Sequence, residues 1–203
     1  EPIAIYAYYP CISWDNKIYI FDKKYLFNSL EEAKNVPPLS EAIKVLEFPR
    51  QKRKPFRCIA DFFANDRLDV IAFTLASAGL KISDYERSLY DKGEFTKYYQ
   101  VHGLGVELAE ALAEVLHKQI RLDLDIVPKE GHTLNDVQMK QYVGCRYSPG
   151  YAACPDLAMN RDIFDLLNPE EFGIELSETF QMHPEQTTCA IVVTHKEANY
   201  YNI

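Results

Sequence analysis

Strand-like segments lie at both ends of this chain, and helical segments are grouped between them. Near the N-terminus, residues 3–9 and 17–21 alternate loosely between apolar and polar side chains and are rich in Tyr and Ile, a pattern typical of strands. Residues 187–193, near the C-terminus, have a similar β-rich character. The longest helix is predicted between them, from about residue 94 to 122. This distribution predicts an α+β fold around an antiparallel sheet.

Local signals predict the remaining elements. Ser83 and Glu86 form a capping-box pattern for a helix that ends near residue 90. The long helix has an apolar stripe at helical spacing, made by Leu104, Leu108, Leu112, Val115 and Leu116. Other predicted elements are a helix at 29–46 interrupted by two prolines, strands at 59–63 and 68–75, a short helix at 135–140, a helix at 156–167, and strands at 175–182 and from 200 onward.

The composition is that of one domain with its own core, because 47% of the 203 residues are hydrophobic. Nothing in the sequence resembles a transmembrane span or a signal peptide, so we expect no membrane contact. Five cysteines lie far apart, which favours reduced thiols and a cytoplasmic protein. Cys145 and Cys154 have no histidine or third cysteine near them in sequence, which argues against a zinc site.

The net charge of −8 makes nucleic acid an improbable partner, since phosphate binding needs clustered cations. One segment is an exception: residues 50–57 hold five basic side chains in eight positions. This segment is either a solvated loop or a docking patch for an acidic protein.

Residues 146–155 combine turn signals with ligand-binding chemistry. Pro149 and Gly150 predict a tight turn, and Pro155 suits the first turn of the following helix. The backbone between these points is expected to be extended and unpaired. Arg146 offers a planar fork for a carboxylate, and Tyr151 an aromatic face for a cation. Such a set would suit S-adenosylmethionine, although the segment can also be a plain turn that leads into a helix.

Several segments carry a resemblance to a known family. Residues 142–156 read Tyr-Val-Gly-Cys-Arg-Tyr-Ser-Pro-Gly-Tyr-Ala-Ala-Cys-Pro-Asp, which resembles the adenosylmethionine-binding motif of the C-terminal reactivation domain of cobalamin-dependent methionine synthase. Residues 58–62, 108–114, 175–184 and 194–201 also resemble that family, in the same order. The likeness runs from about residue 5 to the end of the chain.

The resemblance implies a fold and a set of binding residues. The fold would be a C-shaped single domain with a twisted antiparallel sheet and flanking helices. Arg146 would pair with the ligand carboxylate, assisted by the Tyr151 hydroxyl. Ser148 and Gly150 would supply backbone contacts to adenosine. Tyr200 and Tyr201 would form one wall of the site, and Glu110 would place a carboxylate near the ligand.

Simpler interpretations of some of these residues stay open at this point. Glu107, Glu110 and Glu114 lie at helical spacing on one face, which is usual for a solvated stripe. Tyr200 and Tyr201 can belong to a strand whose aromatics fill the core. The five histidines show no metal-binding spacing, and no catalytic residue is assigned.

The resemblance also implies a reaction and partners. An oxidised cob(II)alamin, bound by another domain of the same enzyme, would be reduced and then methylated by S-adenosylmethionine. That enzyme transfers a methyl group from methyltetrahydrofolate to homocysteine, and its zinc lies in a further domain. Flavodoxin or a similar acidic electron donor would be the partner of the basic segment. This chemistry needs positioning rather than a base.

Other functions remain alternatives to this one. The chain can be a free-standing reactivase for a separate cobalamin protein, a module that senses S-adenosylmethionine, or a structural protein with a vestigial pocket. Its first residue is Glu1, which suggests an excised part of a longer protein. Domain 1–203 would lack the family's N-terminal helical segment and its C-terminal tail.

Overall fold

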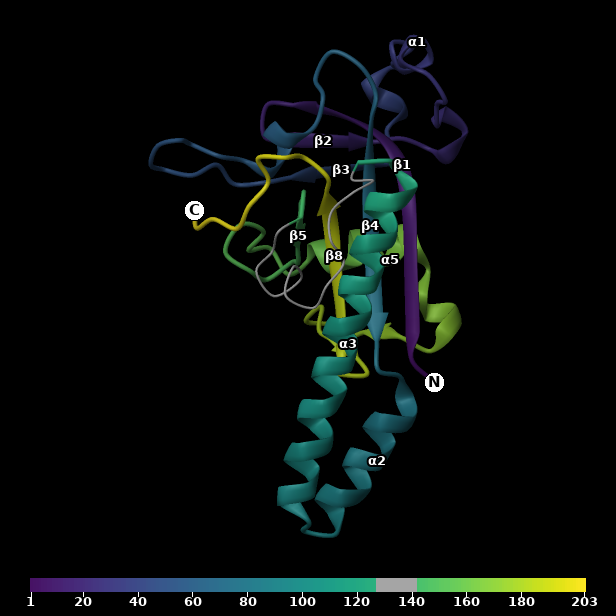
Figure 1. Cartoon of the computed structure of the whole chain (residues 1–203), viewed down its shortest axis with the longest axis vertical. Helices are drawn as coiled ribbons and strands as arrows, with labels where there is room; N and C mark the ends of the chain where they lie inside the picture. Colours follow the sequence, from purple (N-terminus) through teal and green to yellow (C-terminus); the bar gives the residue numbers. More distant parts are fainter. Residues whose placement is uncertain (127–141) are drawn as a thin grey trace.

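The computed structural model describes residues 1–126 and 142–203, and its centre is an antiparallel sheet of six strands in the order β3-β2-β1-β4-β8-β5 (Figure 1). The strands of this sheet are β1 (Ile3–Trp14), β2 (Lys17–Ile20), β3 (Lys44–Glu47), β4 (Asp69–Ser77), β5 (Cys145–Tyr147) and β8 (Thr187–Val193). The predicted α+β fold with an antiparallel sheet is confirmed.

Strand β1 joins the two halves of the sheet because it is long. Its residues 3–11 pair with β4, while residues 11–14 pair with β2. Strand β1 therefore extends beyond its pairing with β4 and continues as the partner of β2, and the sheet curls along it. The prediction of residues 3–9 was correct but too short, since β1 continues through Pro10, which lies opposite Val70.

Helices cover both faces of the sheet. The α-helices of the described residues are α1 (Leu30–Ala33), α2 (Leu80–Asp91), α3 (Phe95–Asp123) and α5 (Met159–Leu167). Successive side chains of a strand point to opposite faces. Ile71, Phe73 and Leu75 of β4 thus enter the main core together with residues of α5, while Ala72 and Ala76 lie against α3. Helices α2 and α3 form a hairpin that projects beyond the end of the sheet (Figure 1).

The bounds of the long helix were predicted almost to the residue, but its buried face was predicted only in part, at Leu116. Leu104 and Val115 of the predicted apolar stripe are exposed. The buried face of α3 consists of Gly105, Ala109, Ala113, Leu116, His117, Ile120 and Arg121. Small residues lie at the contact because the facing side of β4 also carries small residues, and the two backbones can approach closely.

Several shorter predictions were wrong in type or extent. Residues 59–63 are not a strand, because the Asp61 carboxylate accepts a hydrogen bond from the Cys58 amide and caps the 3-10 helix η3 (Ile59–Phe62). Of residues 29–46, only α1 is α-helical, and β3 occupies the end of that range. Helix α2 begins at Leu80 rather than Ser83, after a glycine with positive φ.

Three predictions concern the C-terminal third and residues just before it. The strand predicted at 175–182 is a small hairpin of β6 (Glu175–Leu176) and β7 (Met182–His183). No strand follows β8 within the described residues, so the tail from residue 200 is not part of the sheet. The helix predicted at 135–140 lies outside the described residues. The other 3-10 helices are η1 (Lys23–Tyr25), η2 (Leu39–Glu41) and η4 (Pro169–Phe172).

Candidate functional site

Strand β5 sets the direction of Arg146. It pairs with β8 so that Arg146 lies opposite Val192 and Tyr147 opposite Ile191. Alternation along the strand sends the neighbouring Cys145 and Tyr147 into the core, and Arg146 therefore points to the face on which α3 lies.

Gly144 allows β5 to begin where it does. Its φ is +95°, and a Cβ atom built there would lie 2.5 Å from the carbonyl oxygen of Val193. Any other residue would therefore be strained in its backbone and would collide with β8. The glycine before Cys145 is thus a condition for placing Arg146 at this edge of the sheet.

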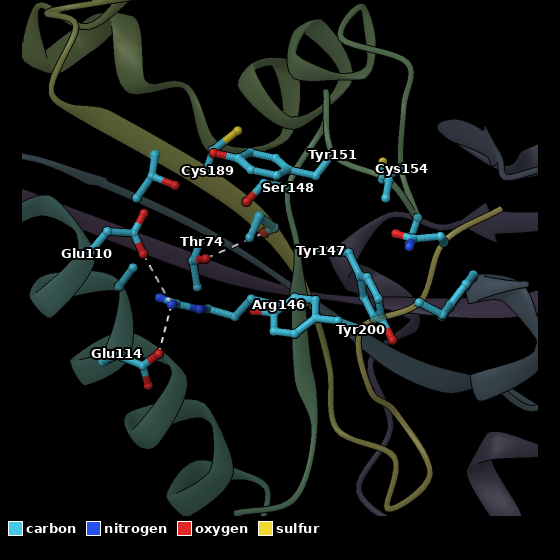
Figure 2. A pocket seen from close by; sticks show the side chains of 17 residues that line it. Thr74, Glu110, Glu114, Arg146, Tyr147, Ser148, Tyr151, Cys154, Cys189 and Tyr200 are labelled. Atoms are coloured by element: carbon cyan, nitrogen blue, oxygen red, sulfur yellow. Dashed lines mark hydrogen bonds and ion pairs between the residues drawn. The ribbon is translucent and has the colours of Figure 1, made fainter. Parts of the chain in front are cut away.

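Two carboxylates of α3 receive the guanidinium of Arg146 (Figure 2). Its Nη2 atom lies 2.8 Å from Oε1 of Glu114 and 3.4 Å from Oε2 of Glu110. The Arg146 side chain is only 12% exposed, and its Nη1 atom is buried without a hydrogen-bond partner among the described residues. A buried donor of a charged group without a partner is costly, which indicates that a ligand can complete the pairing.

A hydrogen bond from a neighbouring tyrosine fixes the position of the Glu114 carboxylate. The Tyr142 hydroxyl donates to Glu114 over 3.2 Å, and burial, followed by the charge of Glu114, raises the pKa of Tyr142 to about 12. The Arg121 guanidinium lies 4.2 Å from the centre of the Tyr142 ring, on which it stacks as a cation. Burial, and then the charges of Arg121 and Arg146, lower the pKa of His117 to about 3, so this imidazole is neutral at pH 7. The sequence alone does not point to these supporting residues, because only the fold brings them together.

The segment after β5 is a tight turn and not the extended backbone that was predicted. The amide of Gly150 donates to the Cys154 carbonyl over 2.8 Å, and the amide of Cys154 donates to the Tyr151 carbonyl over 2.9 Å. Gly150 has a φ of +90°, as the turn prediction required. Pro155 precedes α5 by several residues and is not in its first turn, since the helix begins at Met159.

The C-terminal segment forms another side of the site. The Tyr147 hydroxyl donates to the carbonyl of Asn199 over 2.7 Å and holds this segment beside β5. Tyr201 is 8% exposed and packs into the main core, but its hydroxyl is buried and has no hydrogen-bond partner within residues 1–126 and 142–203. Tyr200 is exposed and places its ring edge-on to Tyr147. The two tyrosines thus differ, one anchoring the tail and the other remaining open to solvent.

These elements enclose a cavity of about 690 Å³. Its lining residues are Thr74, Glu110, Ala113, Glu114, Arg146, Tyr147, Ser148, Tyr151, Ala152, Ala153, Cys154, Thr188, Cys189, Ala190, Tyr200, Tyr201 and Asn202 (Figure 2). The space exists because small side chains from β4, β8 and α3 meet there. A cavity of this size matches a ligand as large as a nucleoside carrying an amino acid.

The structure brings most of the predicted binding residues together. Arg146, Ser148, Tyr151, Glu110, Tyr200 and Tyr201 all line the cavity. Gly150 is not among the lining residues, and its visible role is to form the turn that carries Tyr151. Sequence reasoning missed Glu114 as a lining residue, although its spacing of four from Glu110 already placed both on one face. It also missed Thr74, Thr188 and Cys189, which carry no signal outside the folded sheet.

The two cysteines that line the site are not ionised. Burial raises the pKa of Cys154 and of Cys189 to about 12, so both thiols are protonated at pH 7. Across residues 1–126 and 142–203, no three His, Cys, Asp or Glu side chains gather in a way that could hold a metal ion. The helices of the same residues include none that is long and apolar enough to cross a membrane. The arrangement is suited to hold a polar ligand by charge, main chain and aromatic faces.

Known proteins resemble this chain over almost its whole length. The curated methionine synthases of Mycobacterium tuberculosis (strain ATCC 25618 / H37Rv) and Mycobacterium leprae (strain TN) are each 37% identical to it over 213 residues, which cover 98% of this chain. The chain spans only 17% of the length of these relatives.

A solved structure has the same fold. The crystal structure of the MetH reactivation domain bound to AdoHcy matches with a TM-score of 0.84 and 25% sequence identity, covering 99% of this chain and 61% of that one. The model of the family described as vitamin B12 dependent methionine synthase, activation domain, matches residues 2–203. The sequence resemblance is thereby confirmed, and the chain belongs to the family of activation domains of vitamin B12 dependent methionine synthases.

Proposed function

We propose that the cavity beside Arg146 binds S-adenosylmethionine and presents its methyl group to a cobalamin held by another domain of a methionine synthase. Family membership and the AdoHcy bound to the related domain support this ligand class. The observation that carries the proposal is the buried Nη1 atom of Arg146, which lacks a partner within the described residues and belongs to a side chain that lines the cavity. A ligand carboxylate is the group that would complete it.

The other lining groups match the remaining parts of the ligand. Tyr151 and Tyr200 are exposed aromatic faces that can contact an adenine ring or a sulfonium. The amides of Ala152 and Ala153 make no hydrogen bond within the described part of the chain and can bind polar atoms of adenosine. The buried Tyr201 hydroxyl is a further donor without a partner. Arg146, Ser148, Gly150, Tyr151, Tyr200, Tyr201 and Glu110 are thus our proposed binding residues, with Gly150 acting through the turn.

The residues of this chain would bind and orient the methyl donor, with no proton to move. Reduced cobalamin, when bound by its own domain, would supply the cobalt nucleophile for the methyl group, whose bond to sulfur would break and leave S-adenosylhomocysteine in the cavity. Rate enhancement in such a step comes from holding the reacting atoms in line. This agrees with a site whose thiols are protonated by burial. The full enzyme would transfer methyl from methyltetrahydrofolate to homocysteine in the cytoplasm, with its zinc site in a different domain.

Isothermal titration calorimetry with S-adenosylmethionine tests the proposal. We expect saturable binding with one ligand per chain, and much weaker binding of adenosine or methionine given alone, because each occupies only part of the cavity. Absence of binding by S-adenosylmethionine and S-adenosylhomocysteine alike would contradict the proposed ligand. Methylation of an added cobalamin-binding domain under reducing conditions would separate a reactivation domain from a module that only senses the ligand.

We also propose that the basic segment 50–57 receives an acidic electron donor such as flavodoxin. Lys52, Arg53 and Lys54 are exposed, whereas Arg50 is paired with Asp61 in a bidentate contact of 2.7 Å for each bond. Arg57 donates to the Asn199 side chain over 2.7 Å, so the segment lies against the tail that lines the cavity. An electron donor docked there would be near the proposed methyl-transfer site.

Charge reversal tests this docking surface. Changing Lys52, Arg53 and Lys54 to Glu should slow association with flavodoxin and remove much of its salt dependence. The matched control is a triple reversal of Lys81, Arg87 and Lys92, which are exposed on the α2 side of the hairpin. Equal effects of both triple variants would show a response to net charge and no docking at the basic segment.

A further inference from the structure

The formal charges around the cavity do not cancel. Among the described residues that line it, the charged side chains are two carboxylates, Glu110 and Glu114, and one guanidinium, Arg146. The lining thiols of Cys154 and Cys189 stay protonated at neutral pH because burial raises their pKa. Counting one negative charge for each carboxylate and one positive charge for the arginine, the lining has a formal charge of about −1 at pH 7.

The two carboxylates are not equivalent. Glu114 lies 2.8 Å from Arg146, is 27% exposed, and also accepts a hydrogen bond from Tyr142. Glu110 lies 3.4 Å from the same nitrogen and is 53% exposed. Glu114 is therefore the fixed partner that orients the arginine. Glu110 is the loosely held one, and it can turn toward a cation in the cavity.

Two buried polar groups indicate where a ligand completes this arrangement. The Nη1 atom of Arg146 and the hydroxyl of Tyr201 both lack partners, and both residues line the cavity. A ligand carboxylate can bind Nη1 while Nη2 keeps its contact with Glu114. The carboxylate and the ammonium of the ligand's amino-acid part then cancel each other. The cavity still has one more carboxylate than arginine.

We infer that the acidic pair Glu110 and Glu114 makes this cavity select a ligand with one net positive charge, so that the sulfonium form is bound in preference to the neutral thioether. The inference rests on the proposed function and adds the basis of its selectivity. A carboxylate attracts a nearby cation over several ångströms, and the interaction is stronger away from bulk water. AdoHcy occupies the related MetH domain, so the selection concerns relative affinity and not exclusion by shape.

The test compares affinities for three ligands that share adenosine and an amino acid. S-adenosylmethionine carries the sulfonium, S-adenosylhomocysteine the neutral thioether, and sinefungin an ammonium in place of the methylsulfonium. Calorimetry would give the affinity ratio of each cationic ligand to the thioether for the wild type and for Glu110→Gln, Glu114→Gln and the double variant. The ratio cancels any effect of a substitution on parts that the ligands share.

The expected ratio falls as the carboxylates are removed. Glu110→Gln should lower it by about two- to fivefold, the range of a partly exposed ion pair. Glu114→Gln should lower it at least as much because this carboxylate is less exposed, and the double variant should show no preference for a cation. Sinefungin should follow S-adenosylmethionine in every protein, which would assign the effect to charge rather than to the methyl group.

The matched control is Glu107→Gln. Glu107 is exposed on α3 one turn before Glu110 and does not line the cavity, so the ratio should be unchanged. An unchanged ratio in all cavity variants, with both ligands still bound by the wild type, overturns the inference and leaves the proposed function standing. Failure of the wild type to bind either ligand contradicts the proposed function itself. If Glu114→Gln does not fold, Glu110→Gln alone decides the result.

Discussion

The guanidinium of Arg146 lies 2.8 Å from a carboxylate oxygen of Glu114, although 32 residues separate the two in sequence. The first belongs to a three-residue edge strand and the second to the longest helix of the chain. Their contact spans the cavity wall and fixes the one cation among the described lining residues. The proposed ligand binding in this cavity would therefore depend on how strand β5 and helix α3 are placed.

Replacing Arg146 by alanine should weaken the binding of S-adenosylmethionine by about 1.5–3 kcal/mol, the value of a charge-assisted hydrogen bond. The loss reflects the missing partner for the ligand carboxylate. Calorimetry would measure it, with Arg161→Ala as the matched control, because Arg161 forms its ion pairs with Asp165 and Glu170 around helix α5. An affinity equal to that of the wild type would remove Arg146 from the binding site.

Tyr201→Phe should lower the affinity for the ligand without lowering the free energy of unfolding. Its hydroxyl is buried and lacks a partner, so its removal should leave the free energy of unfolding unchanged or raise it by up to about 1 kcal/mol. If the hydroxyl binds the ligand, the affinity should fall by about 0.5–1.5 kcal/mol. Denaturant unfolding and calorimetry would give the two values.

The matched substitution for that experiment is Tyr147→Phe. The Tyr147 hydroxyl donates to the Asn199 carbonyl over 2.7 Å, so this variant should lose about 1 kcal/mol of stability. A loss of stability in Tyr201→Phe as large as that in Tyr147→Phe would show that the Tyr201 hydroxyl has a structural partner after all.

Gly144→Ala should destabilise the fold strongly. The left-handed backbone costs about 1–2 kcal/mol for a residue with a side chain, and the clash with the Val193 carbonyl adds about 1–3 kcal/mol. Gly93→Ala has a similar positive φ but no atom within 4 Å of the added Cβ, and it should show only the first cost. Chemical denaturation of both variants would test this, and equal losses would mean that β8 can move away from Gly144.

His117 should make the fold sensitive to acid. Its pKa is about 3 in the folded protein, lowered chiefly by burial, against about 6.5 in the unfolded chain. Between these values the unfolded state binds the extra proton, so stability is fully present above pH 6.5 and falls as the pH drops toward 3. The slope should approach about 1.4 kcal/mol per pH unit for this group.

Unfolding curves at a series of pH values would measure that slope. His117→Gln should lack this part of it, and the difference in stability between the variant and the wild type should be constant above pH 7. A variant that loses stability with acid as steeply as the wild type would show that other groups cause the acid sensitivity.

The sequence predicted those parts of the fold that local patterns determine. Helix α3 was predicted from about 94 to 122 and runs from Phe95 to Asp123, because nearly thirty residues of helical pattern leave little choice. Of its buried face only Leu116 was predicted, since the leucine stripe is more apolar than the alanines that meet the sheet. The short apolar run at 59–63 was mistaken for a strand. The Asp61 cap that makes it a 3-10 helix joins residues only three apart, and so short a helix leaves no periodic pattern in the sequence.

The residues of the candidate site were likewise predicted only in part. Arg146 and Tyr151 come from one motif that can be read along the chain, whereas Ser148, Glu110, Tyr200 and Tyr201 came from resemblance. Glu114 and Tyr142 gain their roles only when α3 passes β5, which no local pattern reveals. The extended backbone predicted before Pro155 was wrong because the Gly150 amide bonds the Cys154 carbonyl and closes a turn.

The tail that carries Tyr200 and Tyr201 is attached differently from the rest of the molecule. Side-chain hydrogen bonds from Tyr147, Gln51 and Arg57 hold it, whereas the sheet is held by main-chain ladders. Displacing this tail would break those few bonds and withdraw one ring from the core, while every strand kept its register. Under the proposed function, entry and release of the ligand would therefore not need to disturb the scaffold that aligns the arginine.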